Sequence, residues 1–531
     1  MSDGLERNTR TVMLLTAASR FAGLVRESVL SRLIGTTEAM SAFAFAFLIP
    51  NLFRRLFGEG ALSAAFLPTY QRLADNDPFR AAALAGGMLG LLSLVLGGIV
   101  VVGEMVLFLV SAATEHTHEW LWLMMLMLPY MPLVCVVAIA GAILHVHGRF
   151  GPTAAAPILL NGCLIAIALL GAWYFGVDDH ARRLKVVSVM AGGVVLAGVL
   201  QVVWSLVALR RAAAWRLDLR DATEPIREIL YRAGPMMLGL GVLQINTLID
   251  GLIASWPLIS PSIFGVPYPL DVNSMADLTF AQRLYQFPLG VFGIAVATAI
   301  YPLLSRRSTD MAAFVHTVRR GARLVFFIGL PAGIGLMFVR LPLVEVILQG
   351  GNFGEADSAR VAFVLLGYAA SVWAYALVQV LTRAFYARDE VMTPVRVAMG
   401  MVLLNLTLNI TLIWTPLGVA GLAWSTAICA VIQVLLLVFV LHHRGVLLWC
   451  QSVRISLCQS LVLTAFMAAC LVGAAWFLPA STSWWGSLVN LTLLTLVGGG
   501  MYWGGAVLWK MPEWRWAIGQ AVTGESAMNH H

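Results

Sequence analysis

The stretch FAFLIPNLFRRLFGEGALSAAFLP, from Phe45 to Pro68, places Arg54 and Arg55 side by side in an otherwise apolar run. About 20 mostly apolar residues are enough to cross a bilayer as a helix. A charged side chain at the bilayer centre costs about 2.5 to 3.5 kcal/mol even on the most lenient insertion scale. If this run crosses a membrane, its arginines are therefore expected to face a water-filled cavity rather than lipid.

The composition of the whole chain predicts a membrane setting. Hydrophobic residues make up 60% of the 531 residues and charged residues only 11%, with a mean hydropathy of +0.85. Soluble domains carry about a quarter of charged residues, so this chain is expected to be an integral membrane protein. The net charge of +7 comes almost entirely from arginine. On a membrane chain this charge reflects topology and anionic lipid head groups, and no nucleic acid partner is expected.

Apolar runs of the required length indicate about fourteen spanning helices joined by short loops, an all-α polytopic fold. Of the 34 Lys and Arg residues, 23 fall in loops and tails on one side, four in loops on the other side and seven inside apparent spans. Cytoplasmic loops are enriched in Lys and Arg. The asymmetry predicts a multi-pass protein with both termini in the cytoplasm.

Two pairs of matching segments indicate an internal duplication. ALSAAFLPTYQR, at 61–72, and AVATAIYPLLSR, at 295–306, share the spacing of two alanines, a proline and an arginine. The triplet LLN occurs at 159–161 and again at 403–405. Both pairs are offset by six spans, as in transporters that are built from repeated lobes. We therefore predict a first lobe over 1–225, a second lobe over 226–446, and two further spans with a cytoplasmic tail over 447–531.

The seven cations inside apparent spans are Arg20, Arg26, Arg32, Arg54, Arg55, Arg283 and Arg340. Arg32 and Arg340 lie close enough to helix ends for their side chains to reach the interface. Arg55 precedes Glu59 by four residues, the spacing of an ion pair along a helix, so Arg54 is predicted to be the free cation. The remaining arginines predict an anion site formed by Arg20, Arg26, Arg54 and Arg283.

Arginine suits such a site because its planar guanidinium binds phosphate through two hydrogen bonds and stays charged. Pro50, Gly58 and Gly60 predict that the span carrying Arg54 is broken or bent. The alternative interpretation is a set of internal ion pairs with the carboxylates near these spans, namely Glu27, Glu59, Glu104 and Asp250.

A second group of polar residues is rich in oxygen. Asp250 lies in the seventh span, Asn405 and Asn409 share one face of the eleventh, and Ser425 and Thr426 lie in the twelfth. Carboxylate, carbonyl and hydroxyl oxygens suit a hard monovalent cation such as Na⁺. The alternatives are hydrogen bonds that join neighbouring helices and a proton relay through the carboxyl group. The predicted cation ligands are Asp250, Asn405, Asn409 and Thr426.

Catalytic chemistry is not indicated by any motif in the sequence. The six cysteines show neither CxxC nor Cys/His spacing and are interpreted as reduced packing residues. No Walker loop, HExxH or GxSxG motif occurs. The chain is therefore expected to be a transporter rather than an enzyme, without an organic cofactor.

Five segments together resemble one known family. They read SRFAGLVRE, IPNLFRRLFGEGALSAAFLP, RLYQFPLGVFGIAVATAIYPLLSR, LTRAFYARDEVMTPVR and GVAGLAWSTAICAVIQVLLLVFVLHHR. In order and spacing they are similar to the lipid II flippase family, MurJ or MviN, of the multidrug/oligosaccharidyl-lipid/polysaccharide exporter superfamily. The resemblance covers nearly the whole chain.

The resemblance implies a flippase of the bacterial inner membrane with two lobes and two C-terminal helices. Its substrate would be lipid II, the undecaprenyl-diphosphate-linked precursor of peptidoglycan, moved from the inner to the outer leaflet by alternating access. The family's cavity arginines match Arg20, Arg26, Arg54 and Arg283. Membrane lipids and the machinery of cell-wall synthesis would be its partners.

The sequence also departs from the family pattern. Ser41 and Gln286 stand where acidic residues are usual, and Glu27 stands where aspartate is usual. Both replacements are still expected to form hydrogen bonds. The outer loop from Trp256 to Asp277, which is rich in proline, is longer than usual for the family. The expected supporting residues of the site are therefore Glu27, Arg55, Glu59, Ser41 and Gln286.

The expected driving forces are the membrane potential and coupling to Na⁺ or H⁺. An empty cationic cavity would return to its inward-open state under an inside-negative potential, because one charge across 100 mV corresponds to about 2.3 kcal/mol. Three rival functions remain: a flippase for another polyprenyl-diphosphate-linked glycan, a drug or cation antiporter of the same superfamily, and a non-transporting scaffold of cell-wall synthesis.

Overall fold

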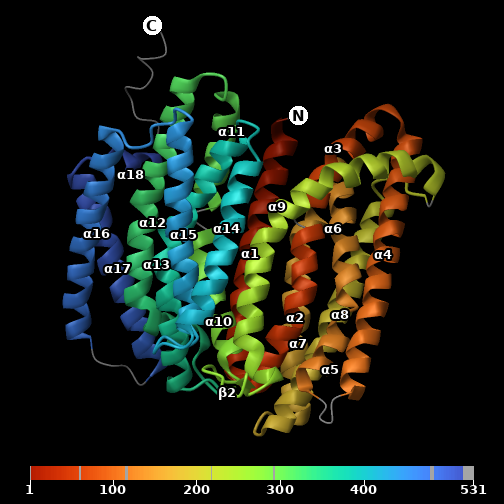
Figure 1. The fold of residues 1–531 in the computed structure, drawn as a ribbon, viewed down its shortest axis with the longest axis horizontal. Helices are drawn as coiled ribbons and strands as arrows, with labels where there is room; N and C mark the ends of the chain where they lie inside the picture. Colours follow the sequence, from red (N-terminus) through yellow and green to blue (C-terminus); the bar gives the residue numbers. More distant parts are fainter. Residues whose placement is uncertain are drawn as a thin grey trace. The chain divides into compact units, whose positions relative to one another are not determined.

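The computed structural model describes residues 2–58, 61–113, 118–216, 218–290, 294–478 and 483–517, and almost all of them are helical (Figure 1). The chain divides into two compact units. The first contains Met1–Ala276 and Gly350–Phe353, and the second contains Asp277–Gln349 and Gly354–His531. The short turn at Gly350–Phe353 thus belongs to the first unit, although the helices on both sides of it belong to the second.

The first unit consists of helices and one small hairpin. Its helices are α1 (Ser2–Ile34), α2 (Glu38–Phe53), the π turn η1 (Arg54–Gly58), α3 (Ala61–Asn76), α4 (Pro78–Ala113), α5 (Glu119–Met127), α6 (Tyr130–Val146), α7 (Gly151–Phe175), α8 (His180–Arg210) and α9 (Leu219–Ile259). The strands β1 (Ser262–Ile263) and β2 (Val266–Pro267) pair antiparallel.

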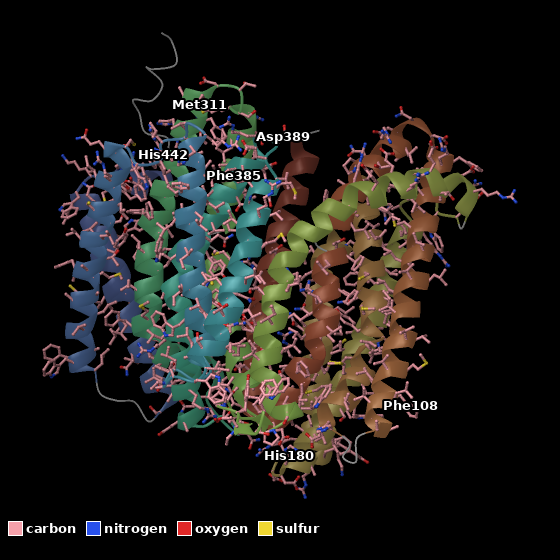
Figure 2. The ribbon with its side chains drawn as sticks, viewed as in Figure 1. Phe108, His180, Met311, Phe385, Asp389 and His442 are labelled. Carbon is pink, nitrogen blue, oxygen red and sulfur yellow. The ribbon has the colours of Figure 1, made fainter. Side chains whose placement is uncertain are left out.

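The second unit is helical in the part of the chain that the structure describes. It begins within α10 (Ser274–Pro288) and continues with α11 (Ile294–Arg306), α12 (Met311–Leu348), α13 (Glu355–Tyr386), α14 (Met392–Leu412), α15 (Ala420–His443), α16 (Gln451–Phe477), α17 (Trp484–Leu508) and α18 (Pro512–Ala517). Met311, Asp389 and His442 lie toward one end of this unit (Figure 2).

Eleven helices of the described residues are long and apolar enough to cross a membrane. They are α2 with η1, α4, α5 with α6, α7, α8, and each helix from α12 to α17. The charged α1 and α9, together with the interrupted pair α10 and α11, complete the predicted set of about fourteen. The fold is therefore the expected all-α polytopic one. Apolar side chains such as Phe108, 66% exposed on α4, point outward as a lipid-facing surface requires (Figure 2).

The predicted break in the second span is present. α2 contains Pro50 and passes into the π turn η1, after which α3 resumes and contains Pro68. The corresponding span of the second unit repeats this plan. α10 ends at Pro288, Leu289 and Gly290 are π-helical, and α11 contains Pro302. The internal duplication read from the sequence therefore extends to a shared interruption of the helix.

The loop between α9 and α10 is more ordered than its proline content suggested. α9 continues to Ile259 and α10 begins at Ser274, so the connection is shorter than the Trp256–Asp277 loop read from the sequence. Its hairpin is fixed by Tyr268, whose hydroxyl donates to the Ile253 carbonyl at 3.0 Å. Burial raises the pKa of Tyr268 to about 12, which keeps this donor protonated.

The boundary between the compact units falls after Ala276, whereas the first lobe was predicted to end at residue 225. α9 crosses the predicted boundary and packs on α2, α3 and α4. This contact groups it with the first unit. The three-part division of the chain remains a prediction about how the spans repeat.

The last helices pack on α12. Phe327 of α12 is buried with Met467 of α16 and Tyr502 of α17, and the Tyr502 hydroxyl donates to the Phe327 carbonyl at 2.7 Å. The short α18 adds a buried carboxylate, since Glu513 is 0% exposed. Its Oε1 accepts from Arg323 Nε at 2.7 Å and from Ser456 Oγ at 2.6 Å. α18 is therefore joined to α12 by an ion pair and to α16 by a hydrogen bond.

The six cysteines, all of them free, differ in burial: Cys135 and Cys429 are buried, Cys163, Cys450 and Cys470 are partly buried, and Cys458 is exposed. The packing role expected from the sequence therefore fits Cys135 and Cys429 and does not fit Cys458.

Candidate functional site

Arg26 on α1 is held by two neighbours. Its Nη1 donates to Asn161 Oδ1 of α7 at 2.9 Å, and its Nη2 forms an ion pair with Glu27. The Arg26 side chain is 12% exposed and that of Glu27 is 5% exposed. Asn161 in turn donates to the Ser19 carbonyl of α1 at 3.4 Å, which fixes its amide between the two helices. The alternative of an internal ion pair is therefore observed for Arg26.

Arg20, on the same helix, is in a different state. Its side chain is exposed, and it forms no hydrogen bond or ion pair with any residue that the structure describes. Glu27, which shares a helix face with Arg20, is engaged with Arg26 instead. Two arginines six positions apart on α1 thus differ, since Arg26 is neutralised by its neighbour and Arg20 is exposed.

Arg54 begins the π turn η1, and its guanidinium bonds to an amide in the last turn of α2. Its Nε and Nη2 both donate to Asn51 Oδ1, at 3.1 and 3.0 Å. The prediction of a free charge on Arg54 considered only the carboxylate of Glu59 and left out the amide three residues earlier. Asn51 is uncharged, so it orients the guanidinium without adding a negative charge.

Arg55 contacts a different helix. Its Nη1 donates to Gln244 Oε1 of α9 at 3.4 Å, a long hydrogen bond. Glu59, the partner expected from the sequence, lies outside the described residues. The two neighbouring arginines thus have separate amide contacts, Asn51 for Arg54 and Gln244 for Arg55.

In the second unit, Arg283 lies on α10 and is half-buried. Its neighbour Gln282 donates to the Tyr368 hydroxyl of α13 at 2.9 Å. Tyr285 stacks on the same Tyr368 with ring centroids 4.6 Å apart and nearly parallel planes. These contacts hold the neighbouring face of α10 against α13, and they thereby hold the backbone of Arg283 in place.

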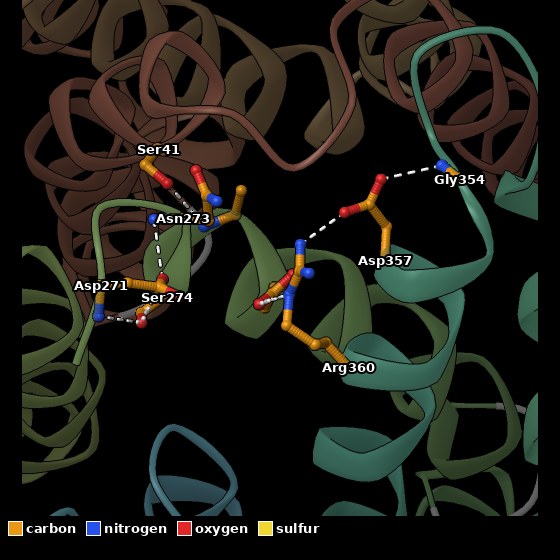
Figure 3. Close-up of polar contacts among 9 residues, drawn as sticks. Ser41, Asp271, Asn273, Ser274, Gly354, Asp357 and Arg360 are labelled. Atoms are coloured by element: carbon orange, nitrogen blue, oxygen red, sulfur yellow. Dashed lines mark hydrogen bonds and ion pairs between the residues drawn. The ribbon is translucent and has the colours of Figure 1, made fainter. Parts of the chain in front are cut away.

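The two replaced acidic positions differ from each other. Ser41 is completely buried, and its Oγ accepts from the Ala276 N–H at 3.1 Å (Figure 3). Since Ala276 is in the first turn of α10, whose N–H groups have no partner within the helix, Ser41 caps that helix. Gln286 forms no side-chain hydrogen bond with the described residues, so the expected hydrogen bonding is confirmed for Ser41 only.

The predicted cation ligands of the second unit bond mainly to one another. Asn405 donates to Ser425 Oγ at 3.2 Å, Asn409 donates to Asn405 Oδ1 at 2.9 Å, and Ser425 donates to Asn409 Oδ1. All three are completely buried. This ring of hydrogen bonds joins α14 to α15, which favours the alternative of interhelical bonding.

The other two predicted ligands lie elsewhere. Thr426 donates to the Leu422 carbonyl of its own helix at 2.9 Å, and Asp250 is a buried residue of the first unit. Among the described residues, no group of three His, Cys, Asp or Glu side chains lies close enough to hold a metal ion. The cation site therefore remains a prediction.

Sequence reasoning missed the amides that hold the arginines. Asn161 had been noticed only as part of the repeated LLN triplet, and its contact with Arg26 spans 135 positions of the chain. Asn51 could have been found, because a polar residue three positions before an arginine lies on the same helix face. Gln244 carried no local signal.

The comparisons with known proteins now identify the family. The family model described as "Lipid II flippase MurJ" matches residues 30–493. The chain belongs to the MurJ family of lipid II flippases. It is therefore a multi-pass membrane transporter associated with the cell wall and peptidoglycan, and not an enzyme. The resemblance stated from the five segments is confirmed.

Two curated relatives match over most of their length. The probable lipid II flippase MurJ of Vibrio cholerae is 32% identical over 516 residues, which cover 92% of this chain and 93% of that protein. The lipid II flippase MurJ of Burkholderia cenocepacia is 29% identical over 493 residues, which cover 89% of this chain and 91% of that protein.

Solved structures support the fold. A lipid II flippase MurJ in an inward closed conformation has a TM-score of 0.74 at 21% identity, covering 94% of this chain and 98% of that one. An inward-facing multidrug resistance transporter of the MATE family has a TM-score of 0.64 at 15% identity, covering 81% and 94%. At these identities the likeness concerns the fold alone.

Proposed function

We propose that this protein moves lipid II from the inner to the outer leaflet of the bacterial cytoplasmic membrane by alternating access. The observation that carries the proposal is membership in the MurJ family, supported by relatives that are named lipid II flippases and match over about nine tenths of the chain. The positive charge of the loops supports an orientation with both termini in the cytoplasm. In this orientation the Ile34 end of α1 faces outward.

We propose further that Arg20, Arg26, Arg54 and Arg283 bind the diphosphate of the substrate. They lie on α1, η1 and α10, which are the charged or interrupted helices of the fold. Each guanidinium presents two parallel N–H donors that match phosphate oxygens. Arg20 is exposed, and the side-chain oxygen of Asn51 fixes the orientation of Arg54.

Arg26 contributes in another way, because Glu27 already neutralises its charge. For Arg26 to bind a phosphate, the ion pair must loosen or the phosphate must compete with the carboxylate. The Arg26–Glu27 pair therefore makes Arg26 a weaker anion ligand in this conformation than Arg20. A cationic cargo is disfavoured, because the three other arginines would repel it.

The proposed driving force is the membrane potential. An empty cationic site returns toward the cytoplasm under an inside-negative potential, with about 2.3 kcal/mol available per charge at 100 mV. Proteoliposomes with and without a potassium diffusion potential test this. Equal flipping rates under both conditions would leave Na⁺ or H⁺ coupling as the remaining proposal.

The test of the transport function is made in cells. The protein is depleted, a membrane-impermeant enzyme that cleaves the lipid II head group is added outside, and the cleaved fraction is measured. We expect lipid II to accumulate in protected form, and wild-type protein, but neither Arg54→Ala nor Arg283→Ala, to restore cleavage. Full accessibility of lipid II without the protein would assign it another polyprenyl-diphosphate-linked glycan as cargo or a scaffolding role.

A further inference from the structure

The turn between α12 and α13 contacts the end of α1, which precedes it by more than three hundred residues. α12 ends at Leu348 and α13 begins at Glu355, and both helices belong to the second unit. The four residues Gly350–Phe353 between them belong to the first unit. Phe353 is only 1% exposed, so the turn is anchored by a buried aromatic ring as well as by polar contacts.

Asn352 uses both its backbone and its side chain to bind the end of α1. Its N–H donates to the Arg32 carbonyl at 2.9 Å, and its Nδ2 donates to the Leu33 carbonyl at 2.7 Å. The last carbonyls of a helix have no partner within the helix. Asn352 therefore caps the C-terminus of α1 from a distant part of the chain.

The side chain of Asn352 also joins α1 to the α7–α8 connection. Its Oδ1 accepts from Arg183 Nη2 at 2.9 Å, and its Nδ2 lies 3.5 Å from the Val177 carbonyl. Arg183 Nε donates to the same Val177 carbonyl at 2.8 Å. One amide thus completes a hydrogen-bonded group that links the ends of three helices.

The backbone is shaped for this close approach. Gly35 has φ +74°, and a Cβ there would lie 2.4 Å from the Asn352 carbonyl oxygen. Gly351 has φ +56°, and a Cβ there would lie 2.3 Å from the Arg32 carbonyl oxygen. Any larger residue at either position would displace the turn. The fit therefore depends on glycine in both partners.

We infer that Gly350–Phe353 is a clasp that binds the outer end of α1 and keeps the outer side of the transporter closed. The clasp is released in each transport cycle, and Asn352 is its positioning residue. The inference rests on the proposed alternating access and orientation. The helices that lead into and out of the clasp belong to the second unit. Movement of that unit would therefore pull the turn from its seat, and Gly350, Gly351 and Gly354 provide backbone freedom on both sides of Asn352.

The first test locks the clasp. Arg183→Cys and Asn352→Cys are combined and joined by a reducible, membrane-impermeant bis-methanethiosulfonate reagent added from outside. The cross-link should lower flipping to the level of depleted cells and leave lipid II binding intact. Reduction of the cross-link should restore flipping. Arg183→Cys alone and Asn352→Cys alone, each treated with the same reagent, serve as controls and should keep flipping. They also report any effect of the reagent on the six native cysteines.

The outcomes separate the two proposals. If the wild type and the two single substitutions do not flip lipid II, the proposed function fails. If they do flip it and the linked protein flips at the same rate, the clasp inference is wrong. Flipping that is lost only in the linked form supports the clasp.

The second test measures release of the seated turn by hydrogen exchange of its backbone amides. Asn352→Ala should speed exchange in the peptide covering 350–353 by about tenfold, because the side-chain hydrogen bonds are lost. Asn273→Ala is the matched control, since this asparagine lies in the α9–α10 connection and its side chain makes no hydrogen bond to a described residue. Unchanged exchange in Asn352→Ala would show that the side chain does not hold the turn and would contradict the role of Asn352.

Discussion

In the first unit, α2 passes through the π turn η1 into α3; in the second, α10 passes through Leu289 and Gly290 into α11. Both spans are interrupted near their middle, and both resume with a helix that contains a proline. The arginines, however, are placed differently. Arg54 and Arg55 are within the π turn, whereas Arg283 precedes the interruption on regular α-helix.

The difference shows that the duplication preserved the bend and not the position of the charge. In the first unit the side-chain amide of Asn51 accepts two hydrogen bonds from Arg54. In the second unit the helix itself is fixed by Gln282 and Tyr285 against Tyr368, beside Arg283. Arg54 is oriented by a contact of its own guanidinium, and the helix that carries Arg283 is fixed by contacts of the neighbouring Gln282 and Tyr285. Variants at these contacts separate the two modes.

The largest effect is expected from removal of the charges. Arg54→Ala and Arg283→Ala should each reduce flipping to the level of depleted cells, because a bidentate phosphate ligand is lost. Arg54→Lys and Arg283→Lys keep the charge and lose the planar fork, so they should restore only part of the activity. Full activity of both lysine variants in the head-group cleavage assay would show that only charge matters.

Asn51→Ala is expected to have an intermediate effect, about a tenfold loss of flipping, because Arg54 loses the acceptor that orients it. The measurement is the initial rate of flipping in proteoliposomes at equal protein content. Gln282→Ala serves as the counterpart in the second unit. This variant should lose less flipping than Asn51→Ala, because Tyr285 still stacks on Tyr368 and continues to fix the helix. An equal loss would contradict the distinction between the two modes.

Ser41→Ala tests how the second broken span begins. Without Oγ, the buried N–H of Ala276 loses its acceptor, and the free energy of unfolding should fall by about 1 to 3 kcal/mol. A lower melting temperature in detergent would report this loss. Ser93→Ala is the control, since Ser93 is exposed and donates only to the Leu89 carbonyl of its own helix. Equal melting temperatures of the two variants would rule out a capping role for Ser41.

The smallest effect is expected for Gln282→Leu. Interhelical hydrogen bonds in membranes contribute about 0.6 kcal/mol on average, so loss of the bond to Tyr368 should lower the free energy of unfolding by about that amount. Gln286→Leu, four residues further along the same helix, removes no hydrogen bond to a described residue and should leave stability unchanged. A larger loss in Gln286→Leu than in Gln282→Leu would contradict the stabilising role of the Gln282–Tyr368 hydrogen bond.

Much of the fold followed from hydropathy and charge, because long apolar runs specify spans directly. The break after Pro50 was predicted from proline and glycine, but the π turn was not, since one extra residue in a helical turn leaves no periodic signal. The capping of α1 by Asn352 was also missed, because it joins segments that are remote in sequence.

The candidate arginines could be selected from the sequence, and the neutral side chains that bond to them could not. Cations stand out because a charge in a membrane is costly. Neutral amides such as Asn51, Asn161 and Gln244 are common and cheap, so nothing marks them in the sequence. An ion pair with Glu27 was among the alternatives, but its partner could not be assigned to Arg26. Adjacent residues of a helix point about 100° apart, and only long side chains bridge that angle.

The short helix α18 also bears on how the protein is handled in the laboratory. Glu513 is buried against Arg323, and Arg323 lies over the Trp516 ring with its guanidinium carbon 4.8 Å from the centroid. A truncation before Pro512 would leave a guanidinium without its carboxylate under the last two spans. Affinity tags and fluorescent reporters are therefore best attached after Ala517, where they leave this contact intact.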